Sequence, residues 1–351
     1  MEEKELIKLT QFSSGSGCGC KIAPADLQDI LSGIVPTGNF ENLLVGNTSN
    51  DDAAVMQLPN GDCIISTTDF FMPIVDDARS FGRIAAANAI SDVYAMGGEP
   101  MMALAILGWP IEQLGAALAS EVINGAQEIC AEAGIPLAGG HSIASKEPIF
   151  GLAVTGKTKA ENLKRNNAAK AGDLLFITKP IGVGIVSTAM KRGKASEADI
   201  SLITKQMSTL NKAGLSLSAI DGVHSMTDVT GFGLLGHLIE MCEGAGLSAE
   251  VDFKKVPTLG NEVLAPYLAQ FIMPDNTMRN FKAFNEKVSK LNAQQLQLLC
   301  DPQTNGGLLI AIDSAAEENV KSILLEHNCY FESIGRITEK AIDAPLISII
   351  N

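Results

Sequence analysis

The sequence predicts two domains, each built as an α/β or α+β sandwich. The length of 351 residues suits two domains at roughly 100–200 residues each. Apolar residues make up 46% of the chain and charged residues 19%, so each half can bury its own core. Strand-like and helix-like segments alternate on both sides of a polar, lysine-rich stretch at 159–172. We therefore expect an N-terminal domain at 49–158 and a C-terminal domain at 170–351, preceded by a Gly-rich segment at 1–48.

In the first half, apolar runs, periodic apolar positions and glycine stops mark the expected elements. We expect strands at 62–68, 101–108, 135–138 and 149–157, and helices at 79–96 and 112–133. The two helices are expected to end at Gly97-Gly98 and at Gly134. The stretch 11–21 is rich in Gly and Ser and could form no core, so we expect a mobile loop or lid there.

The second half is expected to begin with a strand and a glycine-rich turn. Strands are predicted at 173–178, 248–253, 307–312 and 330–336, and helices at 197–219, 232–245 and 314–327. The sequence has no repeat with a period of 20–50 residues, which argues against a solenoid.

Charge and composition exclude several classes of function. The net charge of −14 argues against a nucleic-acid binder, because such proteins displace counterions with Lys and Arg. The first ten residues lack the order of a signal peptide, and the longest apolar run is far short of the ~20 residues of a membrane span, so we expect a cytoplasmic protein. Most of the seven cysteines have apolar neighbours and are expected to be buried, not paired in disulfides.

Aspartates occur in four short motifs in which an apolar segment ends or is interrupted. These motifs are NDDA at 50–53, STTD at 66–69, ISD at 90–92 and MTDVT at 226–230. Mg²⁺ prefers hard oxygen ligands, usually one or two carboxylates together with phosphate and water, so converging aspartates could hold Mg²⁺ around a triphosphate. The alternative is that each aspartate caps a helix or a turn. Asp92 fits that alternative poorly, because it lies inside a predicted helix one turn after Asn88.

The segment Gly17-Cys18-Gly19-Cys20-Lys21 combines a thiol, a cation and flexible backbone. Lys21 would favour the reactive thiolate of Cys18, or would neutralise phosphate oxygens. The alternative is a redox or metal-binding Cys-x-Cys pair, although two thiolates alone form an incomplete zinc site.

Two glycine-rich segments could bind phosphate. Gly139-Gly140-His141 follows a predicted strand, where a turn would present backbone N–H groups to a phosphate, unless it is a plain connection. The stretch 231–236 reads G-x-G-x-x-G, the dinucleotide pattern, with Asp252 21 residues after Gly231. The polar stretch before it and the nearby Asp228 argue for the alternative, close packing of a helix on a glycine face. The sequence contains no P-loop motif.

Taken together, these motifs resemble those of the selenophosphate synthetases, also called selenide, water dikinases. The resemblance extends over nearly the whole chain. It rests on GSGCGCKI at 15–22, LLVGN and DDAAV within 43–55, ISTTDFFMPIVD at 65–76, FGRIAAANAISDVYAMGG at 81–98, ILGWP at 106–110, AGGHSI at 138–143, MTDVTGFGLLGHL at 226–238 and CDPQTNGG at 300–307. The wider superfamily, with aminoimidazole ribonucleotide synthetase and hydrogenase-maturation proteins, shares the Asp and Gly framework.

The resemblance implies an activity, a fold and site residues. The family converts ATP, selenide and water into selenophosphate, AMP and phosphate. By match to the family pattern, Cys18 is the active-site thiol and Lys21 the lysine near the phosphates, while Cys20 matches a position that the family does not require. The implied magnesium ligands are Asp52, Asp92 and Asp228, and the implied nucleotide contacts are Ser49, Asn50, Asp51, Asp69, Gly140, His141 and Ser142, with Lys21 and Asp92 also at that site.

The implied fold has two α/β domains, with the first domains of two chains paired into a barrel-like dimer core near the ATP sites. A potassium requirement is implied by the resemblance alone. Three rival functions stay open at this point. They are an ATP-dependent synthetase acting on a carbon substrate, an NAD-binding oxidoreductase built on 231–236, and a non-catalytic metal or selenium carrier using Cys18 and Cys20.

Overall fold

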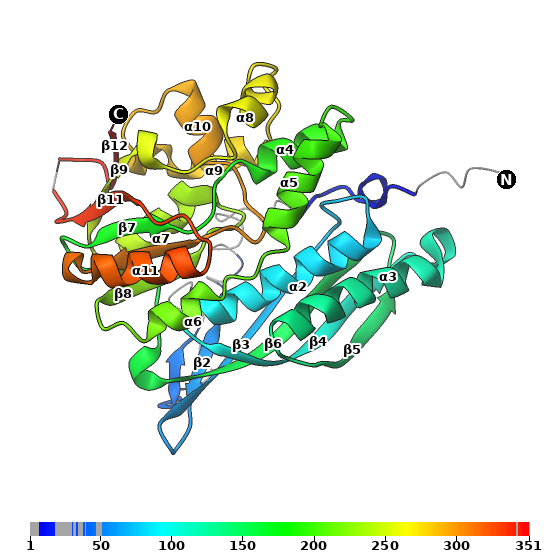
Figure 1. Ribbon diagram of the computed structural model, residues 1–351, viewed down its shortest axis with the longest axis horizontal. Helices are drawn as coiled ribbons and strands as arrows, with labels where there is room; N and C mark the ends of the chain where they lie inside the picture. Colours follow the sequence, from blue (N-terminus) through cyan, green and yellow to red (C-terminus); the bar gives the residue numbers. More distant parts are fainter. Residues whose placement is uncertain are drawn as a thin grey trace.

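Two six-stranded mixed sheets organise the computed structural model, which describes residues 7–17, 30, 33, 38, 40–46, 51–341 and 343–350 (Figure 1). The first sheet has the strand order β1 (Leu43–Val45), β2 (Ala54–Gln57), β3 (Asp62–Phe71), β6 (Ile149–Lys159), β4 (Glu99–Trp109) and β5 (Leu137–Ala144). The second has the order β12 (Ile347–Ile350), β9 (Ser248–Asp252), β11 (Ser333–Thr338), β7 (Leu174–Ile177), β10 (Leu308–Ile312) and β8 (Val223–Asp228). Only the pairs β4–β5 and β12–β9 are parallel among the described strands.

Helices α2 (Ala78–Ala95) and α3 (Ile111–Glu132) cover one face of the first sheet (Figure 1). They approach each other closely, because a Cβ atom at Gly82 would lie only 1.8 Å from the carbonyl oxygen of Val122. Asp77 begins α2 by accepting a hydrogen bond from the backbone N–H of Ser80 at 2.7 Å. Alternate strand positions on the other face remain exposed, so this sheet is covered on one side only within the described chain.

The second sheet carries helices on both faces. Leu309 and Ala311 of β10 point into the core shared with α7 (Gly233–Ala245). Leu308, Ile310 and Ile312 point the other way, toward α6 (Ala213–Ser218) and α11 (Glu317–Glu326). The remaining helices of this half are α4 (Val183–Lys191), α5 (Glu197–Met207), α8 (Asn261–Leu268), α9 (Asp275–Phe284) and α10 (Ala293–Leu299). Short 3-10 turns lie at Leu9–Phe12, Ala160–Asn162, Phe253–Lys255, Asn285–Lys287 and Ser314–Ala316.

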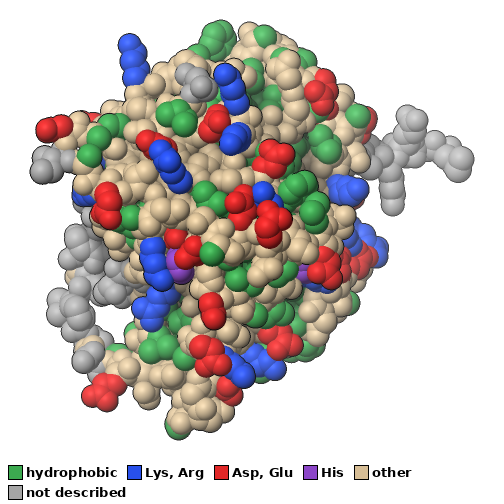
Figure 2. All heavy atoms as spheres, turned by 60° about the vertical axis from the view of Figure 1, so that its left-hand side comes forward, with side chains coloured by type: hydrophobic (Ala, Val, Ile, Leu, Met, Phe, Trp, Pro, Cys, Tyr) green, Lys and Arg blue, Asp and Glu red, His purple; other side chains and the backbone are tan. Residues whose placement is uncertain are grey.

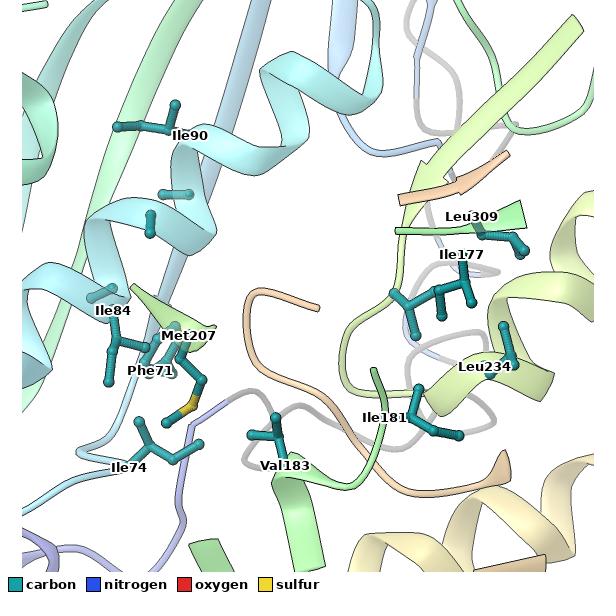
Figure 3. Packing of buried hydrophobic residues seen from close by; sticks show 14 of the residues in the cluster. Phe71, Ile74, Ile84, Ile90, Ile177, Ile181, Val183, Met207, Leu234 and Leu309 are labelled. Carbon is teal, nitrogen blue, oxygen red and sulfur yellow. The ribbon is translucent and has the colours of Figure 1, made fainter. Parts of the chain in front are cut away.

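The two halves share one apolar core. Buried residues of α2 and β3 belong to the same cluster as residues of α4, α5 and α7. Figure 3 shows Met207 of α5 beside Phe71 and Ile84 from the first half. The junction between the halves is therefore packed, and side chains placed there are held from both sides.

Most predicted elements are confirmed with shifted ends, and two predictions are wrong. The helix predicted at 197–219 is two helices, because Ser208 to Lys212 leave the helical ladder between α5 and α6. The strand predicted at 135–138 continues through Gly139 and Gly140 as β5, so no turn follows it. The sequence reading missed β1, β2, β8, β12 and helices α4, α8, α9 and α10.

The residues around the beginning of the Gly/Ser-rich stretch make specific contacts with the rest of the chain, and the mobile loop at 11–21 stays a prediction. Leu9 is fully buried, and Thr10 donates its backbone N–H to Asp76 at 3.1 Å. Ser13 and Gly17 are buried as well. Residues 18–21 of the predicted loop lie outside the described residues.

The burial of the described cysteines agrees with the sequence reading. Cys63, Cys130, Cys242 and Cys300 are buried free thiols. On the face shown in Figure 2, basic side chains are scattered among acidic ones, and the residues drawn in colour form no continuous basic stripe. Among the described residues, no helix combines the length and the apolar character needed to cross a membrane.

Candidate active site

Strand β3 and helix α2 bring two carboxylates and their partners together. Thr67 and Asp69 are two residues apart on β3 and point to one face, while Asn88 and Asp92 are one turn apart on α2. Thr67 donates its hydroxyl to Asp92 Oδ2 at 2.5 Å, and Asn88 donates Nδ2 to Asp69 Oδ2 at 2.6 Å. Asp92 is thus a partnered carboxylate inside a buried helix, as its odd place in the sequence indicated.

Asp51 and Asp52 lie just before β2, at the meeting of the two halves. The backbone N–H of Asn166 donates to Asp51 Oδ1 at 3.2 Å, and the Thr227 hydroxyl of β8 donates to Asp52 Oδ1 at 2.8 Å. Both residues are partly exposed as wholes, yet their Oδ2 atoms are buried and have no hydrogen-bond partner among the described residues. Each therefore turns one unsatisfied carboxylate oxygen into the protein.

Burial raises the pKa values of both carboxyl groups, and repulsion by neighbouring carboxylates adds to the shift at Asp52. Burial raises the pKa of Asp51 to about 6, although the N–H groups of Asn166 and Asp52 oppose the shift. The pKa of Asp52 lies well above its ordinary value, first because of burial and then because Asp228, Asp51 and Asp92 repel its charge. Asp228 ends β8 directly after Thr227. The structure therefore gathers Asp51, Asp52, Asp92 and Asp228 into one electrostatically coupled cluster.

These carboxylates fit a magnesium ion bound together with phosphate. Among the described residues, no group of three or more His, Cys, Asp or Glu side chains is arranged so that it could hold a metal ion by itself. Mg²⁺ usually takes only one or two carboxylates and completes its octahedron with phosphate and water oxygens. Buried, unpartnered oxygens on Asp51 and Asp52 that repel neighbouring carboxylates are what such an ion would neutralise.

A buried lysine that sequence reasoning missed lies near this cluster. Lys179 follows β7 and donates Nζ to the carbonyl oxygens of Thr209 at 2.8 Å and Asn305 at 2.9 Å. Burial lowers its pKa to about 7, although Asp228 favours its charged form. The sequence feature that could have pointed to Lys179 is its position between the strand predicted at 173–178 and Pro180.

The loop 301–305 ties the two halves together beside the aspartates. The backbone N–H of Asn305 donates to Asn88 Oδ1 at 2.7 Å, and its Nδ2 donates to the carbonyls of Met207 and Thr209 at 2.6 Å and 2.9 Å. Asp301 accepts the N–H of Gly184 at 2.9 Å, which holds the start of α4. Asn88 is thereby fixed from both halves while it donates to Asp69.

Gly140, His141 and Ser142 are not brought to the aspartates within one chain. They lie in the exposed edge strand β5, and β6 and β4 separate β5 from β3. Three strand spacings correspond to about 14 Å. The predicted phosphate-binding turn is wrong as a turn. Cys18, Cys20, Lys21, Ser49 and Asn50 lie outside the described residues.

The G-x-G-x-x-G stretch is not part of a dinucleotide-binding fold. Strand β8 is antiparallel to β10 at one edge of its sheet, and β9 lies near the opposite edge, so β8, α7 and β9 form no parallel βαβ unit. A Cβ atom at Gly236 would lie 2.4 Å from the side chain of Phe232, and one at Gly233 would meet the backbone of Cys300. These glycines serve close packing, and the oxidoreductase alternative is wrong.

Comparison with known proteins gives the fold class first. Residues 50–158 match the family model of the AIR synthase related protein N-terminal domain, and residues 170–345 match that of its C-terminal domain. Thiamine-monophosphate kinase from Stenotrophomonas maltophilia K279a shares the fold, with a TM-score of 0.64 at 18% identity over 94% of this chain and 96% of that one. Hydrogenase maturation protein HypE gives a TM-score of 0.65 at 17% identity, covering 88% and 91%. The chain thus has the two-domain fold of AIR synthase related proteins.

Closer relatives identify the family within that class. The chain is 51% identical to a selenide, water dikinase from Aeromonas hydrophila over 331 residues, 94% of this chain and 95% of the relative. It is 50% identical to one from Cronobacter sakazakii, with 99% of both chains covered. A Shewanella relative of the same name is 54% identical over 95% of this chain and 94% of its own length. This chain belongs to the selenide, water dikinase family.

Removal of one charge from the cluster should stabilise the metal-free protein. The pKa values of Asp51 and Asp52 are higher in the folded state than in the unfolded state, so the folded state binds more protons than the unfolded state. The free energy of unfolding therefore falls as the pH rises from about 4 through 6. We expect Asp52→Asn to raise the free energy of unfolding by about 1–2 kcal/mol at pH 7.5 without metal, a rise of a few degrees in Tm.

Thermal unfolding in EDTA at pH 5 and at pH 7.5 checks this expectation. The gain should shrink at pH 5, where the wild-type cluster is partly protonated. Glu339→Gln removes an exposed charge outside the cluster and serves as the control. An Asp52→Asn protein that unfolds below the wild type at pH 7.5 would contradict the repulsion argument.

Proposed function

We propose that this chain converts ATP, selenide and water into selenophosphate, AMP and phosphate, with the aspartate cluster as its metal–phosphate site. Membership of the selenide, water dikinase family supports the reaction. The cluster at the junction of the two halves is the observation that carries the assignment of the site. Incubation with ATP, Mg²⁺ and selenide, followed by ³¹P NMR of the products, tests it. An ADP-producing synthetase would give ADP and phosphate without selenophosphate.

Asp52, Asp92 and Asp228 are the proposed magnesium ligands, and Asp51 and Asp69 are proposed to contact the nucleotide together with Ser49 and Asn50. Bound Mg²⁺ would offset the charge of the phosphates. The chain itself orients the carboxylates: the Thr67 hydroxyl donates to Asp92 at 2.5 Å, and the Thr227 hydroxyl donates to Asp52 Oδ1 at 2.8 Å. The other oxygen of Asp52, Oδ2, has no hydrogen-bond partner among the described residues. Phosphoryl transfer depends mainly on such positioning and charge neutralisation. A potassium requirement stays a prediction from the family alone.

Cys18 and Lys21 are the proposed groups that meet selenide and the terminal phosphate. A thiolate beside a lysine is favoured over the thiol, so Cys18 can capture or steer selenide toward the γ-phosphorus. Lys21 would add positive charge to a site whose described side chains are mostly acidic.

Replacement of the thiol separates nucleotide binding from turnover. We expect Cys18→Ser to lose selenide-dependent AMP formation by at least a hundredfold while Mg-ATP still binds, because the proposed ligands for Mg-ATP lie elsewhere. AMP release with and without selenide, together with the Kd for ATP, provides the measurement, and Cys20→Ser is the matched control. Full selenophosphate output from Cys18→Ser would remove Cys18 from the mechanism.

Neutralisation of a metal ligand should change the magnesium titration. We expect Asp228→Asn to raise the Mg²⁺ concentration for half-maximal activity about tenfold or more, since it removes one hard anionic oxygen from the cluster. Asp221→Asn, an exposed aspartate on the turn before β8, is the control. An unchanged titration for Asp228→Asn would exclude it from the ligand set.

We also propose that two copies pair through the uncovered face of the first sheet. Phe70, Leu104, His141 and Ile143 lie on this face by strand alternation and register. Phe70 is 49% exposed, Leu104 42% and Ile143 61%, which is unusual for large apolar side chains on a sheet. Pairing here would bury them and would place the Gly140–Ser142 strand at the interface, where it could serve the ATP site of the paired chain.

A charge on this face should break the pair. We expect Leu104→Lys to shift the protein from dimer to monomer at micromolar concentration in light scattering, because a buried ammonium without a partner is unfavourable. Leu325→Lys on α11 is the control, because it makes the same change at a residue of the C-terminal half that is 53% exposed. This variant should keep the molecular mass of the dimer in light scattering. A Leu104→Lys dimer of wild-type stability would rule out this interface.

A further inference from the structure

The segment 13–17 lies between the two halves and is held mainly through its backbone. It directly precedes Cys18 in the sequence. Ser13 is buried, but Ser14 to Ser16 border a cavity of about 440 Å³ that is also lined by Met72, Lys191 and Arg279. Since these residues carry no large apolar side chain, polar contacts must fix their place.

Lys191, the last residue of α4, holds the segment from the C-terminal half. Its Nζ donates to the carbonyl oxygen of Ser13 at 3.0 Å and to that of Gly15 at 3.1 Å. A lysine ammonium has three donors, so it can serve both carbonyls at once. The first turn of α4 is in turn held by Asp301, whose Oδ2 accepts the N–H of Gly184 at 2.9 Å. The anchor is therefore connected to the loop that joins the two halves at the aspartate cluster.

Glu147 and Met72 hold the same segment from the N-terminal half. The backbone N–H of Ser14 donates to Glu147 Oε1 at 3.1 Å, and the Ser14 hydroxyl donates to Oε2 at 3.2 Å. The N–H of Gly15 points to Met72 Sδ at 3.3 Å, and the N–H of Gly17 donates to the Met72 carbonyl at 3.0 Å. Met72 follows the end of β3, three residues after Asp69.

Gly17 completes the docking at a position where a larger residue would be strained. Its φ of +50° lies in the left-handed region. A Cβ atom would lie 2.4 Å from Ile74 Cδ1 and 2.6 Å from the hydroxyl of Thr304. The backbone thus passes between a residue of each half immediately before Cys18.

We propose that Lys191 and Glu147 are positioning residues that clamp segment 13–17 from opposite halves and so fix where the Cys18 loop begins relative to the aspartate cluster. This inference rests on the proposed role of Cys18. The clamp acts on the carbonyls of Ser13 and Gly15 and on the N–H and hydroxyl of Ser14, so it sets the path of the chain mainly through backbone groups. In this proposal both residues act through the loop that they hold.

Loss of the lysine should affect turnover more than nucleotide binding. We expect Lys191→Met to lower kcat for selenide-dependent AMP formation on the order of tenfold, because two charge-assisted hydrogen bonds that hold the loop are lost. The KM for ATP should change less than twofold, since the aspartate cluster is untouched. Lys191→Arg should restore most of the rate, because a guanidinium can also donate to two carbonyls.

Hydrogen exchange tests the clamp without reference to activity. In Lys191→Met and in Glu147→Ala the amides of residues 14–17 should exchange at least tenfold faster than in the wild type. If the two residues act as one clamp, the double variant should lose little more kcat than either single variant. Lys194→Met is the matched control, because Lys194 lies three residues farther along and donates to Gln270 at 2.9 Å on the surface.

Each outcome decides between the clamp and the proposed function. Unchanged exchange at 14–17 in Lys191→Met would overturn the clamp. Faster exchange with an unchanged kcat would overturn its positioning role. A wild-type protein that makes no selenophosphate would contradict the proposed function instead, and the exchange data would still decide whether the clamp exists.

Discussion

Repulsion among buried carboxylates is the constraint on which the rest of this structure depends. Asp51, Asp52, Asp92 and Asp228 would separate or take up protons if nothing held them, and the pKa of Asp52 is raised first by burial and then by the repulsion of the other three. Hydroxyl and amide donors keep them in place: Thr67 holds Asp92, and Thr227 holds Asp52. The donors come from both halves of the chain, so the cluster exists only while the halves stay packed together.

The packing of the halves is correspondingly tight at this point. The apolar core continues from α2 to α5, where Met207 lies beside Phe71 and Ile84 (Figure 3). Above it, Asn305 donates to Asn88, and Asn211 donates to Ser91 at 2.8 Å. A ligand at the proposed site would therefore meet a preorganised frame, which is the condition under which electrostatic stabilisation contributes most to catalysis.

Local patterns in the sequence predicted much of the fold and part of the site. Glycine stops and apolar periodicity located α2, α3, β3 and β10, and the odd position of Asp92 inside a helix indicated a partnered carboxylate. Contacts between distant segments could not be read this way. Lys179 and Asn305 matter through carbonyls and amides more than 25 residues away, which no local pattern encodes. The turn at Gly139-Gly140 failed because an edge strand tolerates glycines with positive φ as readily as a turn does.

The unfavourable electrostatics of the cluster also explain why the chain around it carries so many interactions. A protein selected only for stability would replace one of these aspartates, since an isosteric amide removes the repulsion at little steric change. The presence of four carboxylates together at the junction of the two halves is therefore better explained by function than by stability. Hydrogen bonds from Thr67, Thr227 and Asn88, which lie next to the carboxylates, offset part of the repulsion. Under the proposed function, a bound polyphosphate and its cations would restore the stability that the cluster removes, because a ligand that binds only the folded form stabilises it. Nucleotide binding at the proposed site would therefore favour the packed arrangement of the two halves, and a residue that joins the halves, as Asn305 does, would influence the affinity of that site.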